Sequence, residues 1–172
     1  LKSVLLIYCA GMESGTAIAD VLCGDVTPCG KLVDTIAYRY EDYPSSQSFD
    51  YDPLITEYKE GIYVGYRYFE TVPGAAEKVC YPFGYGLSYT DFTYSNCSYQ
   101  IDGELLVLSA DIKNTGKFSG KEIVQAYVMP PAGALEKPAI ELKGYKKTRE
   151  LAPGESFETP EAVLCWSDKG YN

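Results

Sequence analysis

The spacing of apolar and polar residues divides the chain into two parts with different periods. Residues 1–8 are almost continuously apolar, which is typical of a parallel strand buried on both faces. A glycine-bearing loop follows, and then apolar positions that fit one face of a helix, with Ser14 as its N-cap and Gly24 as its C-terminal stop. A strand, a loop and a helix make up most of a βαβ unit. We therefore expect an α/β segment here, continued by a short strand at 31–36 and a long polar loop at 37–59.

The second part alternates with a period of two. Apolar side chains occupy every other position in residues 104–113 and again in residues 122–128. Turns are predicted at residues 114–116 and at Pro153-Gly154. Short alternating strands separated by turns indicate an antiparallel β-sandwich. The boundary between the two parts is expected near residues 90–98.

Between these patterns lie two segments rich in tyrosine and glycine, residues 60–69 (EGIYVGYRYF) and 81–90 (YPFGYGLSYT). The alternation in the first segment predicts a strand that is apolar on both faces. Pro and Gly residues make the second segment an aromatic-walled loop, whose Phe83 we expect to pack against Tyr66. A platform on which sugar rings stack is the alternative interpretation of this aromatic seam. Arg67 needs a carboxylate partner in such a setting, and the role expected for Glu60 is to anchor either Arg67 or a backbone amide.

Composition excludes several classes of function. The chain has 24 acidic and 15 basic residues, a net charge of −9 and no basic cluster, so nucleic acid and anionic membranes are poor partners. No apolar run approaches the roughly 20 residues that span a bilayer. Histidine is absent, which removes Ser-His-Asp and Cys-His catalysis and most zinc sites. The acidic residues of the 37–59 loop do not have the spacing of a calcium-binding EF-hand, and we expect no metal and no cofactor.

The six cysteines are scattered without a Cys-x-x-Cys pair. We expect free buried thiols in the cytoplasm of an anaerobic or otherwise reducing cell. The first residue is leucine, which indicates a piece of a longer protein, and the sequence leaves open whether that protein carries a secretion signal.

Several motifs resemble the C-terminal part of the family 3 glycoside hydrolases, the β-glucosidase and β-xylosidase family. They occur in family order and cover nearly the whole chain: GMESGTAIADVLCGDVTPCGKL, EGIYVGYRYFE, YPFGYGLSYTDFTYS, IKNTG, GKEIVQAYV, ELKGYKK and LAPGES. The resemblance implies an α+β chain. Residues 1–92 would be the C-terminal segment of the α/β (three-layer) sandwich domain, and residues 93–172 a fibronectin type III-like β-sandwich. That sandwich looks incomplete, because few residues follow Pro153-Gly154.

The resemblance also indicates what this chain lacks. In the family the nucleophile is an Asp of a (β/α)8 barrel, and the acid/base Glu lies upstream of the matched α/β segment. Neither position has a counterpart here, so no catalytic residue is expected in this chain. The substrate-binding candidates are Glu13, in a loop that lies near the domain interface in the family, Glu60 and Tyr85. For Glu13 the alternative role is a carboxylate favoured by the dipole at a helix start.

These observations favour a fragment of a retaining, exo-acting β-glucosidase that acts on terminal β-linked glucose of oligosaccharides. In this hypothesis the chain shapes and supports one wall of the active site and is inactive alone. Its partners would be the barrel domain and the upstream α/β segment. The alternative is a free-standing, non-catalytic carbohydrate- or protein-binding module. The sequence does not separate glucosidase from xylosidase specificity, nor the usual domain order from a permuted one.

Overall fold

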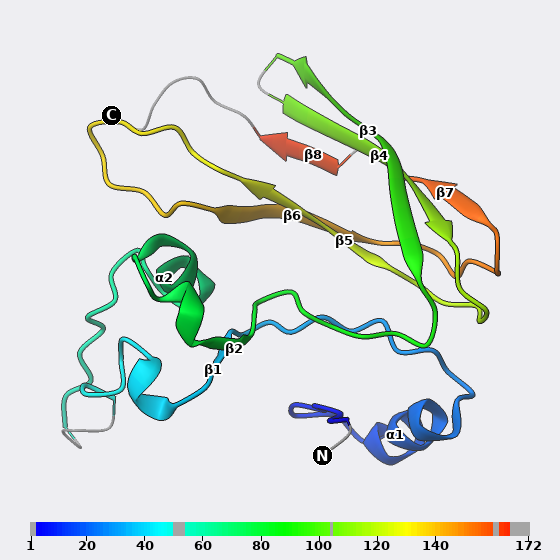
Figure 1. Cartoon of the computed structure of the whole chain (residues 1–172), viewed down its shortest axis with the longest axis horizontal. Helices are drawn as coiled ribbons and strands as arrows, with labels where there is room; N and C mark the ends of the chain where they lie inside the picture. The colour runs from blue at the N-terminus through cyan, green and yellow to red at the C-terminus, as the bar shows by residue number, and fades with distance from the viewer. Residues whose placement is uncertain (1–2, 50–53, 104, 160–161, 166–172) are drawn as a thin grey trace.

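The computed structural model describes residues 3–49, 54–103, 105–159 and 162–165. Its first part contains two short α-helices and a two-stranded ribbon, and its second part is a β-sandwich. In Figure 1 the helices α1 and α2 lie at opposite ends of the first part, and the sandwich lies along one side of both. The expected α+β class is confirmed.

The first helix matches the sequence prediction. Helix α1 spans Ser14–Cys23, and Gly24 ends it in the left-handed conformation, with φ of 85°. The Gly24 N–H donates to the carbonyl oxygens of Asp20 and Val21, which are among the last unpaired carbonyls of the helix. Residue 13 stands at the N-cap position, so the expected cap at Ser14 was misplaced by one residue.

The strand predicted for residues 1–8 is wrong for the part that the structure describes. Residues 3–8 adopt no regular structure, and all six side chains are exposed. A parallel strand forms only when neighbouring strands supply its hydrogen bonds, and the described residues contain no such neighbour. The short strand expected at 31–36 is reduced to β1 (Ile36–Ala37), which pairs antiparallel with β2 (Val79–Tyr81). The 37–59 loop includes a 3-10 turn at Tyr40–Asp42.

The strand predicted within residues 60–69 is also wrong, because residues 60–65 form turns and irregular structure and helix α2 (Tyr66–Thr71) follows them. Gly61 and Gly65 have φ of 57° and 60°, a region that favours glycine and interrupts an extended strand. The helix places Phe69 in a core with Ala37 and Ala75, where its side chain is 2% exposed. A second 3-10 turn, Ala76–Lys78, leads into β2.

The antiparallel sandwich is confirmed. Strand β4 (Leu105–Asn114) pairs with β3 (Phe92–Asp102), β7 (Ser156–Glu158) and β8 (Ala162–Cys165). The facing sheet contains β5 (Ile123–Val128) and β6 (Glu141–Lys147). The alternation analysis predicted β4 and β5 but missed β3, because most of its side chains are small and polar or tyrosine.

Two further properties of the described residues bear on function. Cys9, Cys23, Cys29, Cys80 and Cys97 are free thiols, as expected, and the side chain of Cys165 lies outside the described residues. The expectation that these thiols are buried is wrong, because three of the five are exposed and the other two are partly exposed. Among the helices of the described ranges, none has the length and apolar character needed to cross a bilayer.

Candidate functional site

The aromatic seam joins the two parts of the molecule. The rings of Tyr66 and Phe83 stack with centroids 4.5 Å apart and an interplanar angle of 28°. Tyr127 of β5 meets Tyr66 edge-on, with centroids 6.3 Å apart. The Tyr66 hydroxyl also accepts a 2.8 Å hydrogen bond from the backbone N–H of Leu142. The expected contact between Phe83 and Tyr66 is confirmed, and both rings are half-buried.

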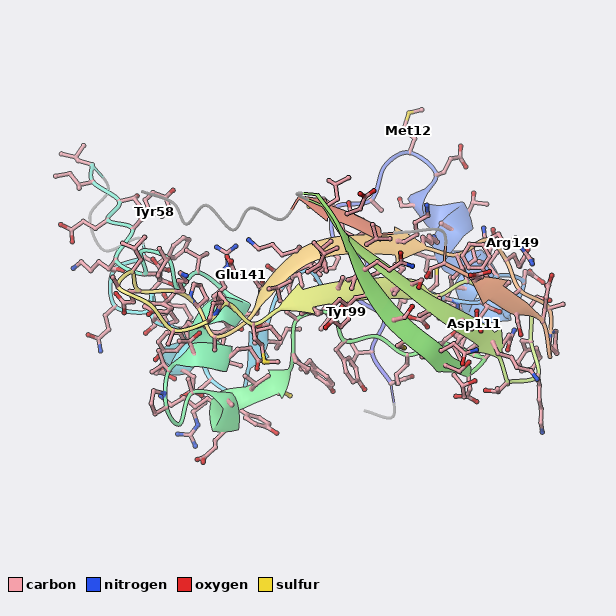
Figure 2. The ribbon with its side chains drawn as sticks, turned by 90° about the horizontal axis from the view of Figure 1, so that it is seen from above. Met12, Tyr58, Tyr99, Asp111, Glu141 and Arg149 are labelled. Atoms are coloured by element: carbon pink, nitrogen blue, oxygen red, sulfur yellow. The ribbon has the colours of Figure 1, made fainter. Side chains whose placement is uncertain are left out.

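An ion-pair network lies beside the seam. The Arg67 guanidinium is 3.1 Å from a carboxylate oxygen of Glu141, and the Lys143 ammonium is 2.9 Å from the other oxygen. Glu141 belongs to β6 and lies beside α2 (Figure 2). Of the two roles expected for Glu60, the one of pairing with Arg67 is wrong, because the carboxylate beside Arg67 is that of Glu141. The carboxylate comes from a strand that is distant in sequence, which a local pattern does not reveal.

A third set of contacts surrounds an open depression of about 370 Å³. The Lys31 ammonium is 2.9 Å from Glu122, whose residue is 8% exposed. Burial raises the pKa of Tyr94 well above its ordinary value, and the charge of Glu122 and a hydrogen bond to it act in the same direction. Lys31 thus comes from the first part of the chain and Glu122 and Tyr94 from the sandwich, so this cluster also bridges the junction.

Two more hydrogen bonds cross the junction near α2. The Tyr63 hydroxyl donates to Glu136 at 2.6 Å. The backbone N–H of Ala139 donates to the Thr71 hydroxyl at 2.8 Å. Both hydrogen bonds connect the segment around α2 to the loop between β5 and β6. The junction is therefore held along its length by contacts of several chemical types.

The three predicted substrate-binding residues do not form one site. Glu13 is exposed directly before α1 and accepts a 3.2 Å hydrogen bond from the Thr16 hydroxyl, which fits a helix-start role. Glu60 is half-buried in the segment leading to α2, a helix that lies at the opposite end of the first part from α1 (Figure 1). Tyr85 is 38% exposed, with its ring 5.2 Å from that of Tyr81.

The residues that line the depression are not predicted by the sequence pattern. They come from four separate segments and include Lys31, Glu122, Gln125 and Tyr127. The alternating pattern places Glu122 in a strand. A charged side chain that becomes buried there needs a partner of opposite charge, and this need was the available signal. The lining contains one carboxylate, and Lys31 neutralises it. Retaining glycoside hydrolysis needs two carboxyl groups roughly 5 Å apart, and the described lining supplies one.

Comparison with known proteins identifies the family. The model of the glycosyl hydrolase family 3 C-terminal domain matches residues 1–89, and that of the fibronectin type III-like domain matches residues 122–160. The chain belongs to glycosyl hydrolase family 3. Residues 1–89 correspond to the C-terminal domain of the family, and the fibronectin type III-like domain follows at residues 122–160. The resemblance seen in the sequence motifs is thereby confirmed.

The relatives of this family 3 chain are β-glucosidases that are much longer. β-Glucosidase A of Butyrivibrio fibrisolvens is 50% identical over 187 aligned residues, covering 100% of this chain and 22% of the relative. The structure of β-glucosidase 3B from Thermotoga neapolitana in complex with glucose superposes with a TM-score of 0.84 at 44% identity. That match covers 93% of this chain and 22% of the other. A β-glucosidase from Paenibacillus barengoltzii gives a TM-score of 0.81 at 48% identity, covering 90% and 17%. The chain thus spans about a fifth of these enzymes.

The packing role of the seam can be tested against the sugar-platform alternative. We expect Phe83→Ala to lower the free energy of unfolding by about 2–3 kcal/mol, because a half-buried ring and its stack on Tyr66 are lost. The measurement is urea denaturation followed by tyrosine fluorescence. Unchanged stability together with a loss of glucose binding would instead favour the sugar platform.

Proposed function

We propose that this chain is the C-terminal segment of a family 3 β-glucosidase, in which it braces the junction between the α/β and fibronectin type III-like domains and supports one wall of the active site. The parent enzyme would release terminal β-linked glucose from oligosaccharides with retention of configuration. The observation that supports this role most directly is the junction itself. Ion pairs, the edge-on contact of Tyr66 with Tyr127, and hydrogen bonds from residues 31–83 reach the sandwich at residues 94–142.

The energetics of the junction suit a bracing role. The Lys31–Glu122 pair is largely buried, with side chains 20% and 11% exposed, so removing one partner would leave a buried charge unpaired. The edge-on contact of Tyr66 with Tyr127 and the hydrogen bonds of Tyr63, Tyr66 and Thr71 add directional contacts between the two parts. A wall of an active site needs this kind of rigidity, because small displacements of substrate-positioning groups reduce the rate strongly.

In this proposal, other parts of the parent enzyme carry out the catalytic chemistry. Two-carboxylate catalysis needs both groups on opposite sides of one bond. Glu13 directly precedes α1 and Glu60 lies in the segment before α2, two helices at opposite ends of the first part (Figure 1), and the carboxylate of Glu122 is held by Lys31. The barrel domain and the upstream α/β segment are the proposed partners. We place the parent in a reducing compartment, because five free cysteines are compatible with one.

A chimaera tests the proposal. This chain would replace the stretch that it matches in β-glucosidase A of Butyrivibrio fibrisolvens, and hydrolysis of an aryl β-glucoside would be measured. We expect activity in the chimaera and none in the purified chain. A folded chimaera without activity would contradict the proposal. So would activity of the purified chain that Glu60→Gln abolishes, because Glu60 would then be catalytic.

A matched pair of variants in the chimaera isolates the junction. Arg67→Met removes the partner of Glu141 at the junction, whereas Arg39→Met removes an exposed arginine outside it. We expect a roughly tenfold or greater loss of kcat/KM for the first and little change for the second. The binding-module alternative predicts saturable binding of cellobiose by the purified chain, which calorimetric titration would detect.

A further inference from the structure

The segment that leads into helix α2 begins with a β-turn at residues 60–63, which we call the Glu60 turn. Its Tyr63 N–H donates to the Glu60 carbonyl at 3.0 Å, and Gly61 has φ of 57°, the positive φ that some turns require at their second position. Of residues 61–65, all of which the structure describes, Tyr63 is half-buried and the other four are exposed. The Tyr63 side chain is therefore the part of this segment that is covered by other elements.

The Tyr63 side chain reaches the loop between β5 and β6, residues 129–140, which we call the β5–β6 loop. Its hydroxyl donates to the Glu136 carboxylate at 2.6 Å. This distance is typical of an O–H donor on a charged carboxylate, and such hydrogen bonds are about twice as strong as neutral ones. The same hydrogen bond raises the pKa of Tyr63, because the carboxylate disfavours a phenolate beside it. The hydroxyl therefore stays protonated and remains a donor.

The β5–β6 loop is itself held in place. It contains three prolines, each with a fixed φ, and Pro138 is buried. The loop runs past α2 (Figure 1), where the Ala139 N–H donates to the Thr71 hydroxyl at 2.8 Å. Because these contacts already restrict the loop, Glu136 loses little conformational freedom when its carboxylate binds Tyr63. A fixed loop is thus joined to a turn whose other side chains are exposed.

We propose that Glu136 is a positioning residue, which acts through the Tyr63 hydroxyl to hold the Glu60 turn against the β5–β6 loop. This inference rests on the proposed function, in which the Glu60 turn belongs to the active-site wall. The fibronectin type III-like domain would then orient a substrate-binding segment without contacting the substrate itself. A wall segment binds the substrate and the transition state alike, so its loosening should raise KM and leave kcat nearly unchanged.

Hydrogen exchange of the purified chain tests the contact without catalysis. Tyr63→Phe keeps the ring and removes only the hydroxyl. We expect the amide of residue 63, which bonds Glu60, to exchange at least about threefold faster, because the turn opens more often. The amide of Val72, which bonds Tyr68 at the end of α2, should keep its rate. Tyr58→Phe is the matched control, since Tyr58 is 86% exposed, and it should change neither rate.

Kinetics of the chimaera with β-glucosidase A test the positioning role. Tyr63→Phe and Glu136→Ala should each raise KM for an aryl β-glucoside about fivefold, with kcat within about twofold. Glu136→Gln should raise KM about twofold at most, because a glutamine amide oxygen accepts the same hydrogen bond. The double variant should raise KM no further than either single change, since both remove one contact. Urea denaturation of each variant should show unchanged global stability.

The outcomes separate this inference from the proposed function. An active chimaera whose KM is unaffected by Tyr63→Phe would overturn the positioning role and leave the proposed function standing. Equal increases of KM for Glu136→Gln and Glu136→Ala would also overturn it, because the hydrogen bond would then not be the cause. Equal exchange rates in Tyr63→Phe and Tyr58→Phe chains would overturn the contact itself. A folded chimaera that is inactive without any substitution would contradict the proposed function, and the positioning role with it.

Discussion

Asn114→Ala is expected to lower the free energy of unfolding by about 4 kcal/mol, a large share of the stability of a domain of this size. The Asn114 side chain is fully buried and makes four hydrogen bonds. Its amide nitrogen donates to the carbonyls of Phe118 and Leu151, both at 2.8 Å. Its amide oxygen accepts from the Thr90 hydroxyl at 2.7 Å and from the Gly116 N–H at 3.0 Å. Alanine would leave several of these partners buried without a replacement.

The matched control is Asn96→Ala. Asn96 is exposed and its amide donates one hydrogen bond, to Asp111 at 2.6 Å. Because Asn96 has φ of 51°, which asparagine tolerates better than alanine, we expect a cost of about 1 kcal/mol. Urea denaturation monitored by circular dichroism would measure both. Equal effects of the two changes would show that the buried network at Asn114 contributes nothing beyond an ordinary surface asparagine.

Phe69→Ala is expected to destabilise the chain by about 3–5 kcal/mol, because a large buried side chain is removed and a cavity remains. Phe69 is 2% exposed and contacts two tyrosine rings edge-on, Tyr43 at 5.9 Å and Tyr68 at 5.2 Å between centroids. It anchors α2 against Ala37 and Ala75. Loss of this anchor should also loosen the junction, since Tyr66 and Arg67 lie on the same helix.

Phe49→Ala is the control for Phe69→Ala. Phe49 is 67% exposed, so its truncation removes little buried surface and should change stability by less than about 1 kcal/mol. Thermal melts of the three proteins would be compared at equal concentration. A melting temperature of Phe69→Ala equal to that of Phe49→Ala would contradict the core position of Phe69.

Local chemistry made part of the fold predictable. Helix α1 was recognised because its apolar face and its Gly24 stop lie within a few residues of each other. Strands β4 and β5 were recognised because alternation with a period of two is visible within a single strand. The family motifs and the contact between Phe83 and Tyr66 were likewise accessible, since both aromatic segments could be identified by composition.

The candidate site depended on contacts between distant segments. Arg67 pairs with Glu141 rather than Glu60, and Lys31 meets Glu122 across the junction. Asn114 was assigned to a turn, and the structure makes it the centre of a buried hydrogen-bond network. In each case the residue type indicated a need for a partner, but the choice among many carboxylates or carbonyls is made by the packing of separate elements.

By itself the sequence determined the chain's family, its antiparallel sandwich and its first helix. Only the tertiary structure decided that residues 66–71 form a helix, that residues 3–8 form no strand, and which charges pair at the junction. The reason is physical. Capping and alternation act over a few residues, whereas an apolar segment takes its conformation from whatever covers it, and a buried charge takes its partner from a strand far along the chain.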